Sequence, residues 1–262
     1  MKYKLADDAR PQVKLLLIAT LITVGLWFIP YAEYLVYPIR LFVTFIHESS
    51  HALVAVLTGG SVQSLTISAD GSGVVYSASS SLIGTLLTSS AGYIGTMVFG
   101  VIMLYLIRRN FSSQKILFIL GSFVGIMTIV FGIISPVFHV FSLQVPFSSV
   151  AFTVISGALI SAGLFALSLY GSQKVSNFAV SFLAVQCVLN AVSDLKTVLF
   201  INSPLIGSDI QTDAGNMATA TGIPGVLWVV IWIGISAALL FLGFRMYSAV
   251  QGAKPSDSLF VD

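Results

Sequence analysis

The sequence predicts an all-α polytopic membrane protein, a bundle of six to seven transmembrane helices with one small β-hairpin. Of the 262 residues, 56% are hydrophobic and only 8% are charged, and the mean hydropathy is +0.98. Soluble domains carry about 25% charged residues, so this chain has too few to cover a water-exposed globular surface. The net charge of +2, with basic residues scattered at segment ends, argues against a nucleic-acid partner. We therefore expect a multi-pass integral membrane protein in contact with the lipid bilayer.

Seven apolar stretches predict the helices, at about residues 15–30, 35–57, 82–107, 116–140, 147–170, 175–200 and 223–247. A spanning helix needs roughly 20 apolar residues, and the first stretch, with about 16, is short of that length. Pro30 ends or kinks it, so both six and seven spans remain open. The expected organisation is a polar N-terminal tail (1–14), a single membrane-embedded domain (15–250) and a C-terminal tail (251–262).

Two connections between these stretches are longer than simple turns. Residues 61–81 hold β-branched, alternating residues on both sides of a glycine turn, which predicts a β-hairpin directly after the second helix. Residues 201–222 are polar and are predicted to be a loop, and they include Asp209 and Asp213.

The second apolar stretch contains the sequence His47-Glu48-Ser49-Ser50-His51. On a helix, His47 and His51 lie one turn apart on one face, where two imidazoles can hold one Zn²⁺. Glu48 lies about 100° away from His47 around the helix, beside the metal, and is the candidate catalytic general base. The competing interpretation is that both histidines only pack against neighbouring helices. The single cysteine, Cys187, excludes a cysteine-based zinc site.

A carboxylate from the sixth stretch is the leading candidate for the third metal ligand. An ionisable residue inside a membrane span is costly and usually functional, and Asp194 is such a residue. His51 and Asp194 each precede the end of their stretch by six residues, so both are expected about 9 Å from the same membrane face. Asp209 and Asp213 are alternative third ligands, although acids in a polar loop are more often solvated or capping.

Asn190 lies one helical turn before Asp194 on the same face. It is a candidate for binding the substrate or the transition state. A plain interhelical hydrogen bond is an equally good explanation of an asparagine at this position.

The segment Phe45-Ile46-His47-Glu48-Ser49-Ser50-His51-Ala52 resembles the site-2 protease superfamily of intramembrane zinc metallopeptidases, and most nearly its short, membrane-only branch B. Weaker similarities follow in Asp70-Gly71-Ser72-Gly73, in Asn190-Ala191-Val192-Ser193-Asp194-Leu195 and in residues 203–224. The resemblance implies that His47, His51 and Asp194 bind zinc and that Glu48 is catalytic. The better-known members place the third ligand in Leu-Asp-Gly, whereas this chain has Ser-Asp-Leu.

The function expected from the motif and the resemblance is that of an intramembrane zinc metalloendopeptidase. It would cleave a peptide bond within or near a transmembrane segment of a protein substrate. The alternative is a non-proteolytic zinc-binding membrane scaffold or a transporter-like protein, because intramembrane ionisable residues also mark transport paths. The presence of Glu48 between the histidines favours the peptidase, since a site that only binds metal has no need of that carboxylate.

Overall fold

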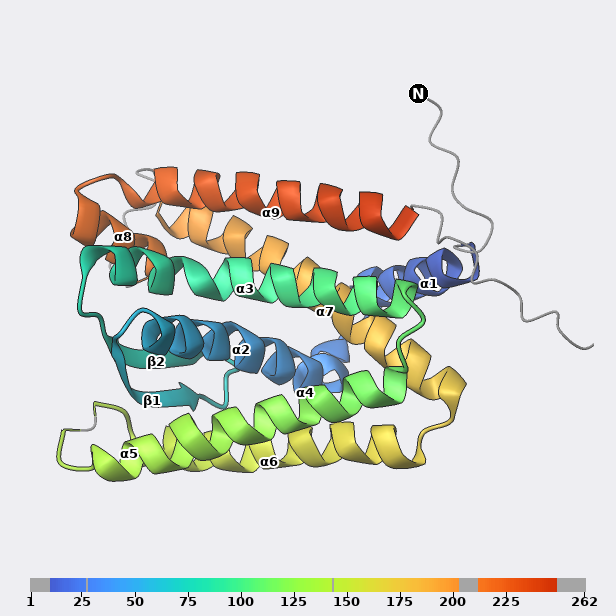
Figure 1. Cartoon of the computed structure of the whole chain (residues 1–262), viewed down its shortest axis with the longest axis horizontal. Helices are drawn as coiled ribbons and strands as arrows, with labels where there is room; N and C mark the ends of the chain where they lie inside the picture. The colour runs from blue at the N-terminus through green and yellow to red at the C-terminus, as the bar shows by residue number, and fades with distance from the viewer. Residues whose placement is uncertain (1–9, 27, 143, 203–211, 249–262) are drawn as a thin grey trace, which may run out of the picture.

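The computed structural model describes residues 10–26, 28–142, 144–202 and 212–248, which fold into a helical bundle with a two-stranded sheet. The helices are α1 (Arg10–Leu26), α2 (Ala32–Leu57), α3 (Leu82–Arg108), α4 (Ser113–Met127), α5 (Ser135–Phe138), α6 (Phe147–Tyr170), α7 (Gln173–Ile201), α8 (Asp213–Thr221) and α9 (Gly225–Ser248), and the strands are β1 (Ser61–Ile67) and β2 (Gly73–Ala78). Figure 1 shows the long helices side by side, with the hairpin and α8 at one end of the bundle.

Within the described ranges, six helical segments are long and apolar enough to cross a membrane: Tyr34–Leu57, Leu82–Arg108, Ser113–Phe138, Phe147–Tyr170, Gln173–Ile201 and Gly225–Met246. The shortest has 22 residues and reaches about 33 Å, the thickness of a bilayer core. The apolar part of α1, Leu16–Leu26, is shorter than a span, and α1 ends before Pro30. The prediction of a multi-pass helical membrane protein is confirmed, with six span-length helices.

The third of these spans is one long helix with a change of winding in its middle. α4 continues without a break through a π-helical segment, η2 (Thr128–Ile134), into α5. α4 packs along α6, where the Ser161 hydroxyl donates a hydrogen bond to the Gly121 carbonyl at 2.8 Å. Small residues allow the two helices to approach closely. In lipid, burial of apolar surface does not favour helix pairing, so close packing and hydrogen bonds of this kind drive it instead.

The predicted β-hairpin is present directly after α2. β1 and β2 pair antiparallel from Ser61 opposite Ala78 to Ile67 opposite Gly73. Gly71 turns the chain with a φ of +83°, a conformation that glycine adopts at little cost. The Asp70 carboxylate accepts hydrogen bonds from the backbone N–H and the hydroxyl of Ser72, which close the turn.

α2 lies at the centre of the bundle, between α3 on one side and the hairpin on the other (Figure 1). β1 packs against α6 and η2 on its far side, and the Ile67 N–H donates to the Thr153 hydroxyl of α6 at 2.6 Å. Each strand keeps one outer edge, and that of β2 is the edge away from β1. β2 also contacts α2, where Gly73 lies against the Glu48 side chain. This arrangement brings β2 next to the His-Glu-His motif.

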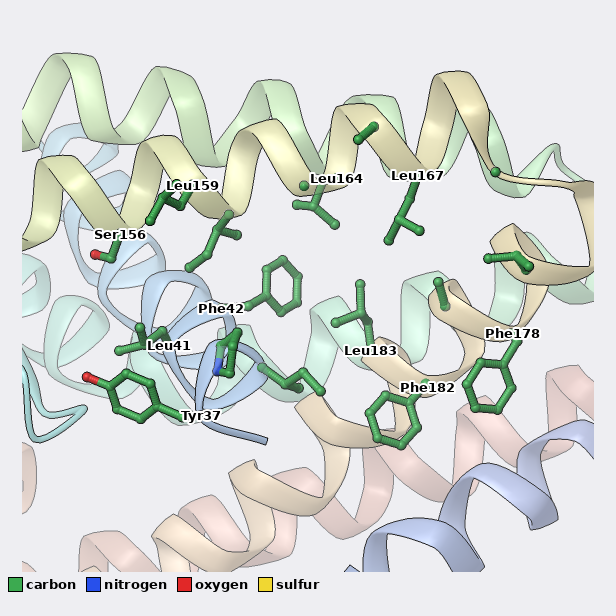
Figure 2. A pocket seen from close by; sticks show the side chains of 18 of the residues that line it. Tyr37, Leu41, Phe42, Ser156, Leu159, Leu164, Leu167, Phe178, Phe182 and Leu183 are labelled. Atoms are coloured by element: carbon green, nitrogen blue, oxygen red, sulfur yellow. The ribbon is translucent and has the colours of Figure 1, made fainter. Parts of the chain in front are cut away.

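A large apolar cavity of about 1110 Å³ lies between α2, α6 and α7. Figure 2 shows Phe42 of α2, Leu164 of α6 and Leu183 of α7 pointing into it from three sides. None of its lining residues belongs to the motif, and the cavities that contain His47 and Glu48 have a separate lining. The apolar cavity is thus distinct from the candidate site.

Candidate metal site and active site

The central turns of α2 hold the motif in a buried position. Phe45 and Ile46 are completely buried, and Glu48 and His51 are each only 6% exposed. From Ile39 to Leu57 the helix contains no glycine or proline, so the geometry of a regular helix is kept through the motif. His47 and His51 therefore share one face, as predicted, and their ring nitrogens Nε2 are 3.1 Å apart.

Asp213 completes a group of three potential metal ligands with the two histidines. Its Oδ2 atom lies 3.4 Å from Nε2 of His51 and 3.8 Å from Nε2 of His47. Zinc bonds of about 2.1 Å in tetrahedral geometry separate neighbouring ligand atoms by about 3.4 Å, so these three distances fit a zinc ion. Within the part of the chain that the structure describes, this is the one such group of histidine, cysteine and acidic ligands.

The orientation of His51 is fixed from its other ring nitrogen. Nδ1 lies 2.6 Å from the backbone carbonyl of Thr88 on α3, which can only accept a hydrogen bond. Nδ1 therefore carries a proton, and Nε2 is the ring nitrogen that is directed towards Asp213 and His47. A carbonyl acceptor behind a ligating histidine is a usual feature of metal sites, because it sets both the tautomer and the ring orientation.

Gly92 of α3 leaves space for the histidine pair. A Cβ atom at this position would lie 2.2 Å from Nε2 of His47 and 2.3 Å from Nε2 of His51, well inside van der Waals contact. The ring nitrogens can therefore occupy their positions only because residue 92 has no side chain. The space beside Gly92, towards which both nitrogens point, is consistent with a binding position for a metal ion.

α8 brings Asp213 to the site. The Thr212 hydroxyl accepts from the Gly215 N–H at 3.1 Å and so caps the helix N-terminus. The same hydroxyl is tied to Asn202, at the end of α7, by a 3.0 Å hydrogen bond. Ala214 and Met217 anchor the helix in a small apolar core with residues of α3, α7 and α9. The region predicted as a polar loop thus contains a helix whose first residue is Asp213.

The charge state of Asp213 suits a metal ligand. Burial alone would raise the pKa of its carboxyl group, but the imidazoles of His51 and His47 outweigh this effect and hold the pKa well below its ordinary value. Asp213 is therefore ionised at neutral pH, as a metal-binding carboxylate must be.

Glu48 lies at the junction of two polar cavities, of about 250 Å³ and 720 Å³, which both reach His47. The first residue of β2 packs directly against its side chain. A Cβ atom at Gly73 would lie 2.6 Å from Oε1 of Glu48. Glu48 is not part of the metal-ligand group, but it lines both cavities beside His47 and the first residue of β2. Its role as a general base stays a prediction.

Two further predicted residues, Asp194 and Asn190, lie outside the ligand group. Asp194 and Asn190 of α7 line the smaller cavity together with His47 and Glu48. Asp194 therefore lies near the histidines, but its carboxylate is not among the grouped ligand atoms. The Asn190 amide donates to the Gln186 backbone carbonyl, one turn earlier in the same helix, at 2.9 Å. Asp209 lies outside the described residues.

The sequence reasoning did not single out three residues of α3 that contact the site, namely Thr88, Gly92 and Tyr93. No motif marks Thr88 or Tyr93. Ala91 and Gly95 are small residues four positions apart in an apolar helix, as are Gly92 and Thr96, and such spacing indicates close approach of a second helix. That signal predicts the packing of α3 on α2, although it does not identify which α2 residues are contacted.

Comparison with known proteins is consistent with this geometry. No curated protein and no solved structure matches the chain. The sequence model of the Peptidase M50B-like family matches residues 16–243, a range that contains the motif helix, the hairpin, α7 and α8. Because this match covers most of its length, the chain belongs to the Peptidase M50B-like family, a site-2 protease family of membrane metallopeptidases.

Proposed function

We propose that the protein is an intramembrane zinc endopeptidase, which hydrolyses a peptide bond within or near a transmembrane segment of a protein substrate. The observation that carries this proposal is the convergence of His47, His51 and Asp213 beside the buried carboxylate of Glu48. Three protein ligands and an open fourth position are typical of catalytic zinc sites, whereas structural sites are usually closed by four. The membership in a membrane metallopeptidase family supports the same conclusion.

In this proposal Asp213, rather than Asp194, is the third ligand. The distances of 3.4 Å and 3.8 Å from its Oδ2 atom to the histidine nitrogens support the assignment. Asp194 remains the alternative that the family resemblance implies. Its place in the cavity beside Glu48 also suits a residue that contacts the substrate.

The roles of the remaining groups follow from their positions. A zinc ion, when bound, would polarise the scissile carbonyl as a Lewis acid. Glu48 takes a proton from the attacking water and delivers it to the leaving amine. Its side chain is 6% exposed and lines both polar cavities beside His47. Thr88 holds the His51 ring in its ligating orientation through the Nδ1 hydrogen bond.

The hairpin supplies a surface for the substrate. Residues 73–77 of β2 line the larger cavity together with His47, Glu48 and Asp213. The carbonyls of a transmembrane helix are hydrogen-bonded within the helix, so the substrate must unwind before it can be cleaved. We propose that the unwound segment adds to the β2 edge as a further strand, which would place its backbone beside Glu48.

The test combines metal analysis with cleavage of a membrane-helix substrate by the purified full-length protein. Wild type is expected to contain one zinc ion and to cleave, and Glu48→Gln is expected to keep the zinc and lose cleavage. Asp213→Asn should lower zinc content far more than Asp194→Asn, which serves as the matched acid because it lines the smaller cavity beside His47 and Glu48. Cleavage that persists in Glu48→Gln would contradict the peptidase mechanism, and zinc loss in Asp194→Asn alone would transfer the ligand role to that residue.

A further inference from the structure

Tyr93 of α3 connects the candidate metal ligands to a helix that carries none of them. Its side chain is 6% exposed, it lines the larger polar cavity together with Asp213, and it packs in one apolar cluster with Ala214, the next residue of α8. The Tyr93 ring meets the His47 imidazole edge-on, with ring centroids 4.8 Å apart and planes at 81°. One side chain thus contacts a proposed zinc ligand from α2 and lies in the same cavity as another from α8.

The Tyr93 ring also packs against Trp232 of α9. The two rings stack with centroids 5.2 Å apart and an interplanar angle of 29°. Trp232 is itself 1% exposed, and its indole N–H donates to the Ser90 hydroxyl of α3 at 2.9 Å. Both interactions join α9 to α3, so the indole packs on the Tyr93 ring and restricts its orientation.

The chemistry of the phenol suits it to orient a carboxylate. A carboxylate ligand can turn about its Cβ–Cγ bond and present either oxygen to a metal, so its orientation needs a hydrogen-bond donor on the side away from the metal. A tyrosine hydroxyl can act as such a donor, an ionised carboxylate can only accept, and Tyr93 lines the same cavity as Asp213. Asp213 begins α8, a helix of nine residues, and therefore depends on contacts with α3 for its position.

We infer that Tyr93 is a positioning residue, which holds the Asp213 carboxylate and the His47 imidazole in ligand geometry and is itself held by Trp232. This inference rests on the proposed zinc site. It assigns a part in metal binding to α3 and α9, which supply no ligand. The aromatic pair of Tyr93 and Trp232 is then a support for the metal site as well as part of a small apolar core.

The test measures zinc affinity by competition with a chelator, using the full-length protein in detergent. Tyr93→Phe keeps the ring and its stacking and removes only the hydroxyl, and it is expected to weaken zinc binding about 10- to 100-fold. Tyr105→Phe, on the same helix and outside the cavities of the site, is the matched control and should bind zinc as wild type does. With Co²⁺ in place of zinc, Tyr93→Phe should also change the visible absorption spectrum at equal metal loading.

A double-mutant cycle separates positioning from a general effect on folding. If Tyr93 acts through Asp213, Tyr93→Phe should cost little further affinity in an Asp213→Asn background. Losses that simply add in the double variant, or Tyr93→Phe with wild-type affinity and spectrum, would overturn the inference while leaving the zinc site intact. Wild type that binds no zinc would instead refute the proposed function, and the inference with it.

Discussion

Substitution of Gly92 by alanine is a direct test of the metal site, because the added methyl group would fill the space that the two histidine nitrogens occupy. In Gly92→Ala the new Cβ would lie 2.2 Å and 2.3 Å from the Nε2 atoms of His47 and His51. Ordinary van der Waals contact requires 3.4 Å or more. Each nitrogen must therefore move by about 1 Å, or α3 must move away from α2 by a similar distance.

The displacement can be compared with the tolerance of metal coordination. Metal–ligand distances in working sites stay within about 0.2 Å of their usual values, so a shift of 1 Å at two ligands at once cannot be absorbed. Loss of a supporting residue alone costs about 10- to 100-fold in metal affinity. We expect Gly92→Ala to reach the upper end of this range or exceed it, a loss of about 100-fold, or about 2.8 kcal/mol of binding free energy.

The assay is zinc affinity and zinc content of purified protein, with thermal unfolding as the measure of folding. Gly95→Ala is the matched control, because residue 95 lies on the same helix and its Cβ would lie 2.5 Å from the Cβ of Ser50, on the same α2–α3 interface. It should strain the packing to a similar degree and keep the zinc. Gly163→Ala, with nothing within 4 Å of the new atom, should change neither property.

Two results would refute this reasoning. Gly92→Ala with wild-type zinc affinity would show that the two nitrogens do not bind a metal from the positions described. Equal loss of zinc in Gly95→Ala would show that the effect comes from helix packing and not from the histidines.

Three further predictions concern the hairpin and the apolar cavity. Gly73→Ala places a Cβ 2.6 Å from Oε1 of Glu48, so cleavage should fall by about 10² or more while zinc content stays at the wild-type level. Hydrogen bonds from the Ser72 hydroxyl and backbone N–H lower the pKa of Asp70 in the folded protein, so its contribution to stability is present at neutral pH and lost as the pH falls through that pKa. The difference in Tm between wild type and Asp70→Ala should accordingly shrink below about pH 4, and a constant difference would contradict this. Gly163→Leu projects into the apolar cavity and should leave zinc content and cleavage unchanged, whereas loss of either would connect that cavity to the site.

The sequence predicted those features that depend on local pattern. The apolar lengths predict six to seven spanning helices, of which the described residues contain six, and the alternation around Asp70-Gly71 predicts the hairpin. Both signals arise from neighbouring residues. The spacing of His47 and His51 fixes their common face through helix geometry alone. The contacts of Tyr93 and Trp232 are not of this kind, since the two residues are far apart in the chain and belong to helices without a motif.

The third ligand shows where sequence reasoning reaches its limit. Depth along a helix is readable from sequence, and it brings Asp194 to the cavity beside Glu48. Depth does not fix rotation about the helix axis, which decides whether a side chain faces the histidines or only the cavity next to them. Asp213 was expected in a polar loop, but Thr212 caps a short helix there and Ala214 and Met217 dock it on the bundle. The carboxylate is thus delivered by a tertiary contact between α8 and α3, and a ligand of this type becomes predictable only when the packing of that helix is known.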